Sequence, residues 1–243
     1  MQISENSVRI SEIFTSIEGE GIYVGTKTMF IRLAGCHLKC RWCDTPYALP
    51  MDSGKEYSIH QAKEQIKSLL QPFTYKVNFT GGEPLLQHHA IISLADFLKN
   101  EKGLKTYIES SCFDSHRFSE ILHYIDICKI EFKTPDSGVT RTDNYDDLLL
   151  NEFECLELAQ KYGKTTYIKV VTTNSTSIAW FKELVHDIFS KCNRQNISGF
   201  VIQPSTGMDE PTLAKLFNFY DFVFPLYPEV RIIPQLHKEI CAR

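Results

Sequence analysis

The sequence has no apolar run long enough to cross a lipid bilayer. Its longest apolar stretches, such as Ile121–Ile127, are interrupted by polar residues and fall far short of the roughly 20 residues that a spanning helix needs. The start of the chain also lacks the charged-then-apolar pattern of a secretion signal. We therefore expect a soluble, cytoplasmic protein with no membrane partner.

An excess of positive charge is also missing. The 243 residues include 26 Lys and Arg against 30 Asp and Glu, which gives a net charge of −4. Proteins that hold a polyanion usually carry a basic excess, so nucleic acid is not expected as a partner. With 12 Gly, 10 Pro and 43% hydrophobic residues, the composition excludes collagen-like and disordered classes.

No internal repeat, low-complexity tract or linker divides the sequence, so we expect residues 1–243 to form a single domain. A chain of this length buries enough surface to fold without a metal or disulfide to hold it together. Because no secretion signal is present, a disulfide framework is not expected from the eight cysteines. Five scattered cysteines are predicted to be small buried side chains. They are Cys112, Cys128, Cys155, Cys192 and Cys241.

The other three cysteines form a C-x3-C-x2-C segment of Cys36, Cys40 and Cys43. A structural zinc ion usually takes four ligands in two pairs, and His37 directly follows Cys36 and could hardly reach the same metal. A redox pair of Cys40 and Cys43 would leave Cys36 without a role. Three thiolates on a [4Fe–4S] cluster leave one iron open, which suits the amino and carboxylate groups of S-adenosylmethionine. The residues favour the cluster, with zinc and core or redox thiols as the alternatives.

Strand-like apolar segments alternate with helical patterns along the rest of the chain. The expected strands are Met29–Leu33, Lys76–Phe79, Leu104–Ile108, Ile125–Phe132, Thr166–Val171, Gly199–Ile202 and Phe222–Phe224. The expected helices are Ser58–Leu70, Ala90–Lys99, Ser115–His123, Tyr145–Tyr162, Ser175–Cys192 and Glu210–Tyr220, with Pro211 in the first turn of the last. Near-continuous apolar strands in about six such units predict an α/β fold, a partial (β/α)6-type barrel with a parallel sheet covered by helices.

Polar and glycine-rich loops follow five of the expected strands. They contain Gly35, Thr80–Pro84, Glu109–Ser111, Lys133–Gly138 and Gln203–Gly207. In such folds the chemistry lies at the C-terminal ends of the strands, so these loops should meet at one rim. Ordinary turns use the same residue types, and any one loop taken alone is equally consistent with a turn.

Two of these loops resemble those of a known superfamily. The three cysteines, with Trp42 before the last, resemble the cluster loop of radical S-adenosylmethionine enzymes, and Thr80–Pro84 resembles their Gly-Gly-Glu-Pro loop. The resemblance implies a TIM-like partial barrel, with Cys36, Cys40 and Cys43 as catalytic ligands of a [4Fe–4S] cluster. Paired glycines let backbone approach the methionine part of the cofactor closely.

Over nearly its whole length the chain is most similar to the 7-carboxy-7-deazaguanine synthases, which serve queuosine and archaeosine biosynthesis. The marks are Glu12–Gly21, Gly25, Phe30–Arg32, Cys43–Thr45, Phe132–Gly138 and Ile233–Lys238. One departure is Glu18, where the family usually has Gln. Gln can donate hydrogen bonds and a carboxylate cannot, although a backbone contact from this position would survive the change.

The resemblance implies that 6-carboxy-5,6,7,8-tetrahydropterin is rearranged to 7-carboxy-7-deazaguanine, with ring contraction and loss of ammonia. The reduced cluster would cleave S-adenosylmethionine, and the 5′-deoxyadenosyl radical would take hydrogen from C6 of the pterin and later return it. It further implies Mg²⁺, an electron donor such as flavodoxin or ferredoxin, and a homodimer.

The resemblance also distributes roles among the residues. Cofactor-side residues would be Gly81, Gly82, Glu83, Ser110, Lys133 and Gln203, with Glu83 as an organiser rather than a catalyst. Substrate-side residues would be Ile17, Glu18, Gly19, Glu20, Arg32 and Thr80, and Thr45 would contact Mg²⁺. Gln235 and His237 would belong to the pocket or a lid, whereas His88-His89 is expected to be a solvated helix start.

Simpler roles stay open for three of these residues. Thr45 would also suit a capped turn, Arg32 a solvated strand position and Lys133 an ordinary ion pair. Three other functions compete with the synthase: an activase that installs a glycyl radical on a partner enzyme, a zinc-stabilised binding module and a tRNA-modifying enzyme.

Overall fold

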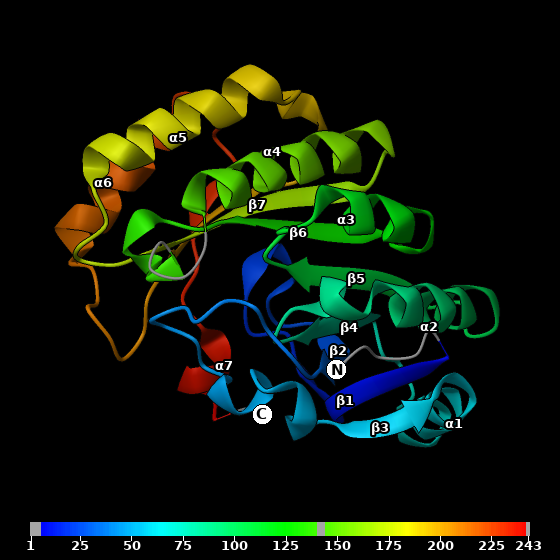
Figure 1. Ribbon diagram of the computed structural model, residues 1–243. Coiled ribbons are helices and arrows are strands. Elements are labelled where there is room, and N and C mark those ends of the chain that lie inside the picture. The colour runs from blue at the N-terminus through cyan, green and yellow to red at the C-terminus, as the bar shows by residue number, and fades with distance from the viewer. Residues whose placement is uncertain (1–5, 140–143, 242–243) are drawn as a thin grey trace.

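The computed structural model describes residues 6–139 and 144–241. Within these ranges all strands join one sheet in the order β3-β1-β2-β4-β5-β6-β7-β8-β9 (Figure 1). The strands are β1 (Ser7–Ile17), β2 (Lys27–Leu33), β3 (Lys55–Ser58), β4 (Lys76–Gly81), β5 (Lys105–Ser110), β6 (Ile127–Phe132), β7 (Thr165–Thr172), β8 (Phe200–Pro204) and β9 (Val230–Ile232). The α-helices are α1 (Ile59–Leu69), α2 (His88–Asn100), α3 (Ser115–Ile121), α4 (Tyr145–Lys161), α5 (Ile178–Lys191), α6 (Leu213–Val223) and α7 (Leu236–Glu239).

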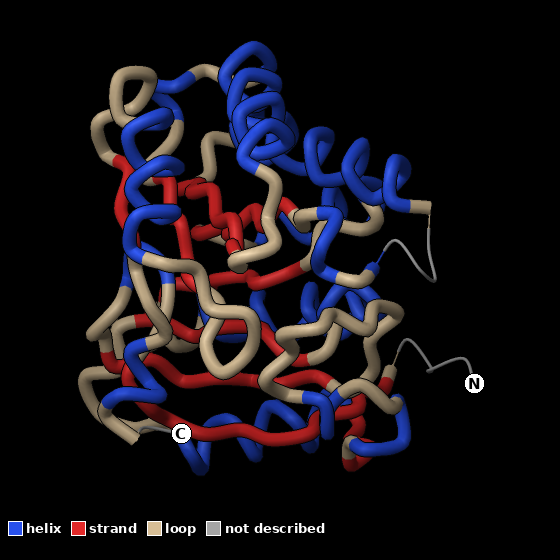
Figure 2. Tube along the Cα trace, turned by 90° about the vertical axis from the view of Figure 1, so that its left-hand side faces the viewer, coloured by secondary structure: helices blue, strands red, loops and turns tan. Residues whose placement is uncertain are grey.

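The sheet is parallel from β2 to β9, and β1 and β3 extend it as an antiparallel edge. Helices α1 to α6 connect successive parallel strands and cover the outer face of the curved sheet (Figure 1). Strands β3 and β9 stand at opposite ends of this order and do not pair with each other, so the barrel is open. Figure 2 shows loops crowding the face on which the parallel strands end.

Side chains of each parallel strand alternate between the helix-covered outer face and the interior of the barrel. Side chains that point outward, such as Ile31, Phe79, Ile130 and Val170, are fully buried against the helices in the main hydrophobic core. Successive side chains of a strand lie on opposite faces, so the residues between them point into the barrel. The expectation of near-continuous apolar strands was therefore wrong for part of the inner face, which carries charged side chains such as Lys129 and Glu131. Beside them lies a small buried cluster of Tyr107, Ile127, Tyr167 and Val201.

Most of the expected elements are confirmed within a few residues, as is the open α/β barrel. Helix α1 begins at Ile59 because the Ser58 side chain accepts the Gln61 N–H, and Gln61 returns a bond to the Ser58 N–H. The expected strand Phe222–Phe224 was wrong, because α6 extends to Val223. Pro211 also lies outside α6, which Thr212 caps.

Strands β1, β3 and β9 were missed. Strand β9 has only three residues, and β3 is an edge strand whose side chains are mostly exposed. Strand β1 mixes buried and half-buried positions without the continuous apolar pattern of the central strands. Short or half-covered edge strands leave little hydrophobic pattern in a sequence.

Two expectations about burial need correction. Four of the five scattered cysteines are buried as predicted, but Cys241 is exposed. His88 does begin α2, but it is buried and its Nε2 lies 2.9 Å from a Glu120 carboxylate oxygen, whereas His89 is exposed. Every helix in the described ranges is too short or too polar to span a membrane.

Candidate active site

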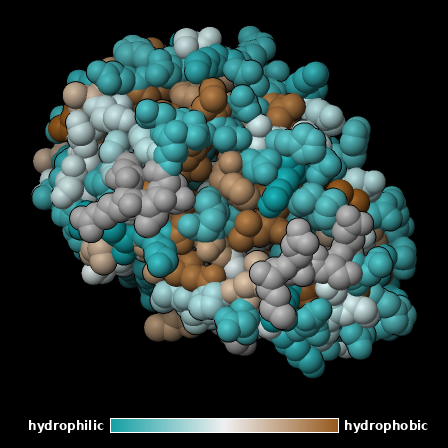
Figure 3. All heavy atoms as spheres, in the orientation of Figure 1, coloured by the Kyte–Doolittle hydropathy of each residue, from teal (hydrophilic) through white to brown (hydrophobic). Residues whose placement is uncertain are grey.

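A cavity opens where the parallel strands end. It holds about 1200 Å³ of empty space, including the part open to solvent. Every predicted site residue lines it except Glu83. Figure 3 shows mostly hydrophilic residues on the face of Figure 1, with hydrophobic ones gathered around its centre. The expectation that the loops after the strands meet at one rim is confirmed for the loops that carry these residues.

The cysteine loop is fixed by its backbone. Gly35 has a φ of +95°, and its N–H and that of Cys36 donate to the carbonyls of Ala48 and Leu49, each at 2.9 Å. The Arg41 N–H donates to the Ser137 carbonyl at 2.8 Å, which ties the loop to the segment after β6. Backbone hydrogen bonds thus hold the loop both at Gly35–Cys36 and at Arg41.

The three thiols of this loop are free, half-buried and turned to the cavity. Burial raises the pKa of Cys36 to about 12 and also raises that of Cys40, because a thiolate loses hydration there. A bound metal ion compensates for the lost hydration of a thiolate, so the three half-buried thiols fit an iron–sulfur cluster. His37 instead packs its ring on Phe113 at 4.1 Å, outside the cavity lining, and does not complete a zinc tetrahedron.

The glycine loop after β4 lies directly against the cysteine loop. A Cβ on Gly81 would come within 2.2 Å of the Leu33 carbonyl oxygen, and one on Gly82 within 2.2 Å of the Gly35 carbonyl oxygen. The Gly82 N–H donates to Leu33 at 3.1 Å. Only glycine fits these two positions, which bring bare backbone to the cavity wall.

Glu83 does not line the cavity but stabilises the two segments that form this part of its wall. It is 1% exposed, and its carboxylate accepts hydrogen bonds from the Leu85 N–H at 2.9 Å and from the Ser110 hydroxyl and Ser111 N–H at 2.7 Å each. These bonds join the loop after β4 to the end of β5. Among the described residues, the buried Ser111 Oγ and Gln203 Oε1 have no hydrogen-bond partner, although both residues line the cavity. Such atoms suit a polar ligand.

The inner face of the sheet holds a charged network that the sequence analysis missed. Glu131 accepts the ammonium groups of Lys129 at 2.9 Å and Lys133, and Lys169 lies 3.3 Å away. Burial alone would raise the pKa of Glu131, but the three ammonium groups hold it well below its usual value. The alternation in Lys129-Ile-Glu131-Phe-Lys133 could have revealed the network, because every second residue of a strand shares one face.

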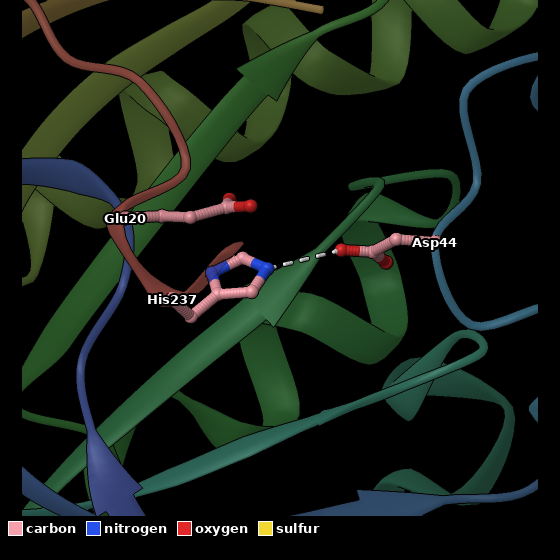
Figure 4. Close-up of side chains that lie close together, drawn as sticks. All are labelled: Glu20, Asp44 and His237. Carbon is pink, nitrogen blue, oxygen red and sulfur yellow. Dashed lines mark ion pairs between the residues drawn. The ribbon is translucent and has the colours of Figure 1, made fainter. Parts of the chain in front are cut away.

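Glu20, Asp44 and His237 meet at the mouth of the cavity (Figure 4). Their possible ligand atoms lie within 4.8 Å of one another, and His237 Nε2 is 3.7 Å from Asp44. Gln235 Nε2 donates to Glu20 at 2.7 Å and to Asp44 at 3.2 Å, and Lys169 also binds Glu20. The neighbouring Asp44 carboxylate raises the pKa of His237. The structure thus brings the C-terminal segment to the site, as expected for Gln235 and His237.

Arg32 lies on the same inner face and is not a solvated strand residue. Its Nε donates to Glu12 Oε1 at 2.7 Å, and the Tyr47 hydroxyl donates to the same oxygen at 2.6 Å. The guanidinium lies 5.6 Å from the centre of the Phe14 ring. These contacts fix the side chain at the cavity wall.

Comparisons with known proteins agree with this geometry. Residues 17–137 match the family described as a 4Fe-4S single cluster domain. The chain is 30% identical to the 7-carboxy-7-deazaguanine synthase of Methanocaldococcus jannaschii, with 94% of this chain and 98% of that protein covered. The chain belongs to the 7-carboxy-7-deazaguanine synthase family. It is a radical S-adenosylmethionine enzyme, as the resemblance of its two loops implied.

Solved structures share the fold of this synthase-family chain. QueE from Escherichia coli aligns with a TM-score of 0.64 at 18% identity, covering 95% of each chain. SuiB from Streptococcus suis, solved with S-adenosylmethionine, aligns with a TM-score of 0.53 at 18% identity, covering 82% of this chain and 45% of SuiB. At these identities the likeness establishes the open-barrel architecture.

Proposed function

We propose that this chain is a 7-carboxy-7-deazaguanine synthase acting on 6-carboxy-5,6,7,8-tetrahydropterin. One observation carries the proposal: three free thiols, a glycine-only wall and the side chains of Arg32 and Glu20 line one cavity. The thiols and glycines suit the radical chemistry, and the arginine suits an acid substrate. The ring contraction and loss of ammonia follow from the family to which the chain belongs.

Cys36, Cys40 and Cys43 would hold the [4Fe–4S] cluster, as their donor chemistry supports. When bound, the reduced cluster and S-adenosylmethionine supply the radical that abstracts hydrogen from the substrate. Gly81 and Gly82 would admit the cofactor close to the backbone. Further cofactor contacts are proposed for Ser110, Lys133 and Gln203, with the free Gln203 Oε1 as an acceptor.

On the substrate side, Arg32 would bind the pterin carboxylate with the guanidinium nitrogens that Glu12 does not use. Glu20 would accept hydrogen bonds from the aminopyrimidinone edge, and Lys169 keeps this carboxylate paired and oriented. Ile17, Gly19 and Thr80 would complete the pocket.

We also propose that the Thr45 hydroxyl would help to hold a Mg²⁺ ion, which would supply positive charge for the substrate carboxylate. Thr45 lines the cavity next to Asp44, and with Glu20 nearby the mouth is rich in oxygen ligands, which a hard cation prefers. The same family expectation supports a flavodoxin or ferredoxin as electron donor, a single-domain homodimer in the cytoplasm, and a product that enters 7-deazapurine biosynthesis.

The proposal is tested with anaerobically reconstituted protein. Incubation with the carboxytetrahydropterin, S-adenosylmethionine, Mg²⁺ and a reductant is expected to yield 7-carboxy-7-deazaguanine and ammonia. Turnover should be insensitive to salt, because binding through phosphates, as in a tRNA-modifying enzyme, weakens steeply with salt. An iron-loaded protein that forms no product, or a preparation that holds zinc without iron or sulfide, would reject the proposal.

Substituting Arg32→Ala is expected to weaken pterin binding about 10- to 100-fold while leaving the iron content unchanged, because a charge-assisted double hydrogen bond is lost. The pterin affinity of Arg32→Lys should lie between those of the wild type and Arg32→Ala, since lysine keeps the charge but lacks the planar guanidinium group. Calorimetric titration of each reconstituted variant measures the effect.

Arg9→Ala is the matched control, because Arg9 pairs with the exposed Glu56 at 2.8 Å, outside the cavity lining. It should bind pterin like the wild type. An Arg32→Ala variant that loses iron but binds pterin normally would show that the role given to Arg32 is wrong.

A further inference from the structure

The two glutamates of the segment Glu18–Glu20 are each held by a buried lysine from a different strand. Glu20 binds Lys169 of β7, which lines the cavity. Glu18 binds Lys76 of β4, which is fully buried and does not line the cavity. Lys76 therefore makes no direct contact with a ligand in the cavity.

The contacts of Lys76 show how strongly it anchors Glu18. Its ammonium donates to a Glu18 carboxylate oxygen and, at 2.9 Å, to the Thr28 hydroxyl. It also lies 4.6 Å from the centre of the Tyr107 ring. Asn78 Nδ2 adds a weak contact to the same Glu18 oxygen at 3.4 Å, while Asn78 Oδ1 is buried with no partner in the described ranges.

The backbone of Glu18 also closes the loop from Glu18 to Thr26, which contains substrate-side residues. Its N–H donates to the Thr26 carbonyl at 2.7 Å, and its own carbonyl accepts the Gly25 N–H at 2.8 Å. The side chain is 3% exposed, and one of its carboxylate oxygens accepts the Lys76 ammonium. Burial raises the pKa of Glu18 to about 7, even though Lys76 opposes the shift, so the carboxylate depends on this one cation.

We propose that Lys76 is a positioning residue for substrate binding: by pairing with Glu18 below the cavity, it sets the segment Glu18–Glu20 and thereby the Glu20 carboxylate. This inference rests on the proposed function for the identity of the substrate. A carboxylate left buried without its cation is strongly unfavourable, so in Lys76→Met the Glu18 side chain either takes up a proton or moves outward, and in both cases the segment loses its ionic anchor.

The test is a set of substitutions at the two positions. Lys76→Met is expected to raise the dissociation constant and KM for the carboxytetrahydropterin roughly 20-fold, because small misplacements of binding groups have large effects. The iron content, the affinity for S-adenosylmethionine and kcat at saturating pterin should stay near wild type. Adding Glu18→Gln to Lys76→Met should restore pterin affinity to within about 3-fold, since the buried charge is gone and the amide can donate to Asn78 Oδ1.

A second pair of variants covers the case in which Lys76→Met alone does not fold. Neither Lys76→Met/Glu18→Gln nor Lys76→Met/Glu18→Ala contains an unpaired charge at these positions, but only the first retains a polar anchor at position 18. The Gln variant should bind pterin at least about 10-fold more tightly. Lys99→Met is the control. Lys99 pairs with Asp126, at a distance of 2.7 Å, and neither residue belongs to the segment Glu18–Glu20 or to its contacts described above.

Amide hydrogen exchange distinguishes a failure of the proposed function from a failure of the positioning role of Lys76. Exchange at Glu18 and Gly25 should accelerate in Lys76→Met and recover in the Gln double variant, whether or not a pterin is present. If the wild type binds no pterin but this exchange pattern holds, the proposed function fails and the positioning role stands. If the wild type binds pterin and Lys76→Met alters neither affinity nor exchange, or if the two double variants bind pterin equally, the positioning role is wrong.

Discussion

Replacing Cys40 by alanine is expected to leave a folded protein with no measurable turnover. The remaining thiols cannot hold a cluster at three corners, and no other cysteine among the described residues lines the cavity. Cys40 packs at the edge of the small cluster of Leu38, Val139 and Leu148, outside the main core. The free energy of unfolding should therefore fall by no more than about 1–2 kcal/mol.

Iron and sulfide analysis, the visible absorption of the cluster, and product formation measure this prediction. The melting temperature of the apo-protein should fall by at most about 8 °C, given about 2–4 °C per kcal/mol for a chain of this size. Cys241→Ala is the control, because Cys241 is exposed and should be dispensable for both iron and turnover. Full iron content with wild-type turnover in Cys40→Ala would contradict the assignment of this thiol.

Replacing Gly82 by alanine is expected to lower turnover at least about 100-fold, through displacement of the cysteine loop. The added Cβ would lie 2.2 Å from the Gly35 carbonyl oxygen and 2.9 Å from the Cys36 Cβ. Backbone cannot yield as a flexible side chain does, and the Glu83 N–H also binds this carbonyl at 2.7 Å. The two loops must therefore separate at the place where, under the proposed function, the cluster and S-adenosylmethionine would meet.

The effect is measured as iron content, affinity for S-adenosylmethionine and turnover of the reconstituted variant. Gly103→Ala is the control for adding a methyl group to a loop glycine. Gly103 has a φ of +64° but nothing within 4 Å of an added Cβ. Alanine at this position should lower the free energy of unfolding by about 1–2 kcal/mol and leave turnover unchanged. Turnover of Gly82→Ala equal to that of Gly103→Ala would show that the close approach of the loops is dispensable.

Local chemistry made a large part of the site predictable. The three cysteines and the paired glycines act through residue type and spacing, which can be recognised in the sequence before any fold is known. Their placement after successive strands also followed, because parallel strands bring their ends to one edge. The burial of Cys112, Cys128, Cys155 and Cys192 was predictable for the same kind of reason, since it reflects a general preference of the side chain.

Pairwise contacts between distant residues were not predictable. Glu18 was expected on the substrate side and does line the cavity, but the pairing of its carboxylate with Lys76, a residue 58 positions away, was not foreseen. Arg32 was expected on the substrate side, with a solvated strand position as the alternative, but its contacts with Glu12 and Phe14 at the cavity wall were not foreseen. Such pairs depend on strand register, which composition and periodicity do not encode.

The sequence by itself determined the chemistry of the cluster loop, the glycine wall and the alternation of strands and helices, because each depends on neighbours along the chain. Only the tertiary structure decided which lysine pairs with which glutamate inside the open barrel, and that Gln235 of the C-terminal segment bonds both Glu20 and Asp44 at the cavity mouth. The physical reason is desolvation: a buried charge must find its partner in space, and that partner comes from whichever strand the fold places opposite.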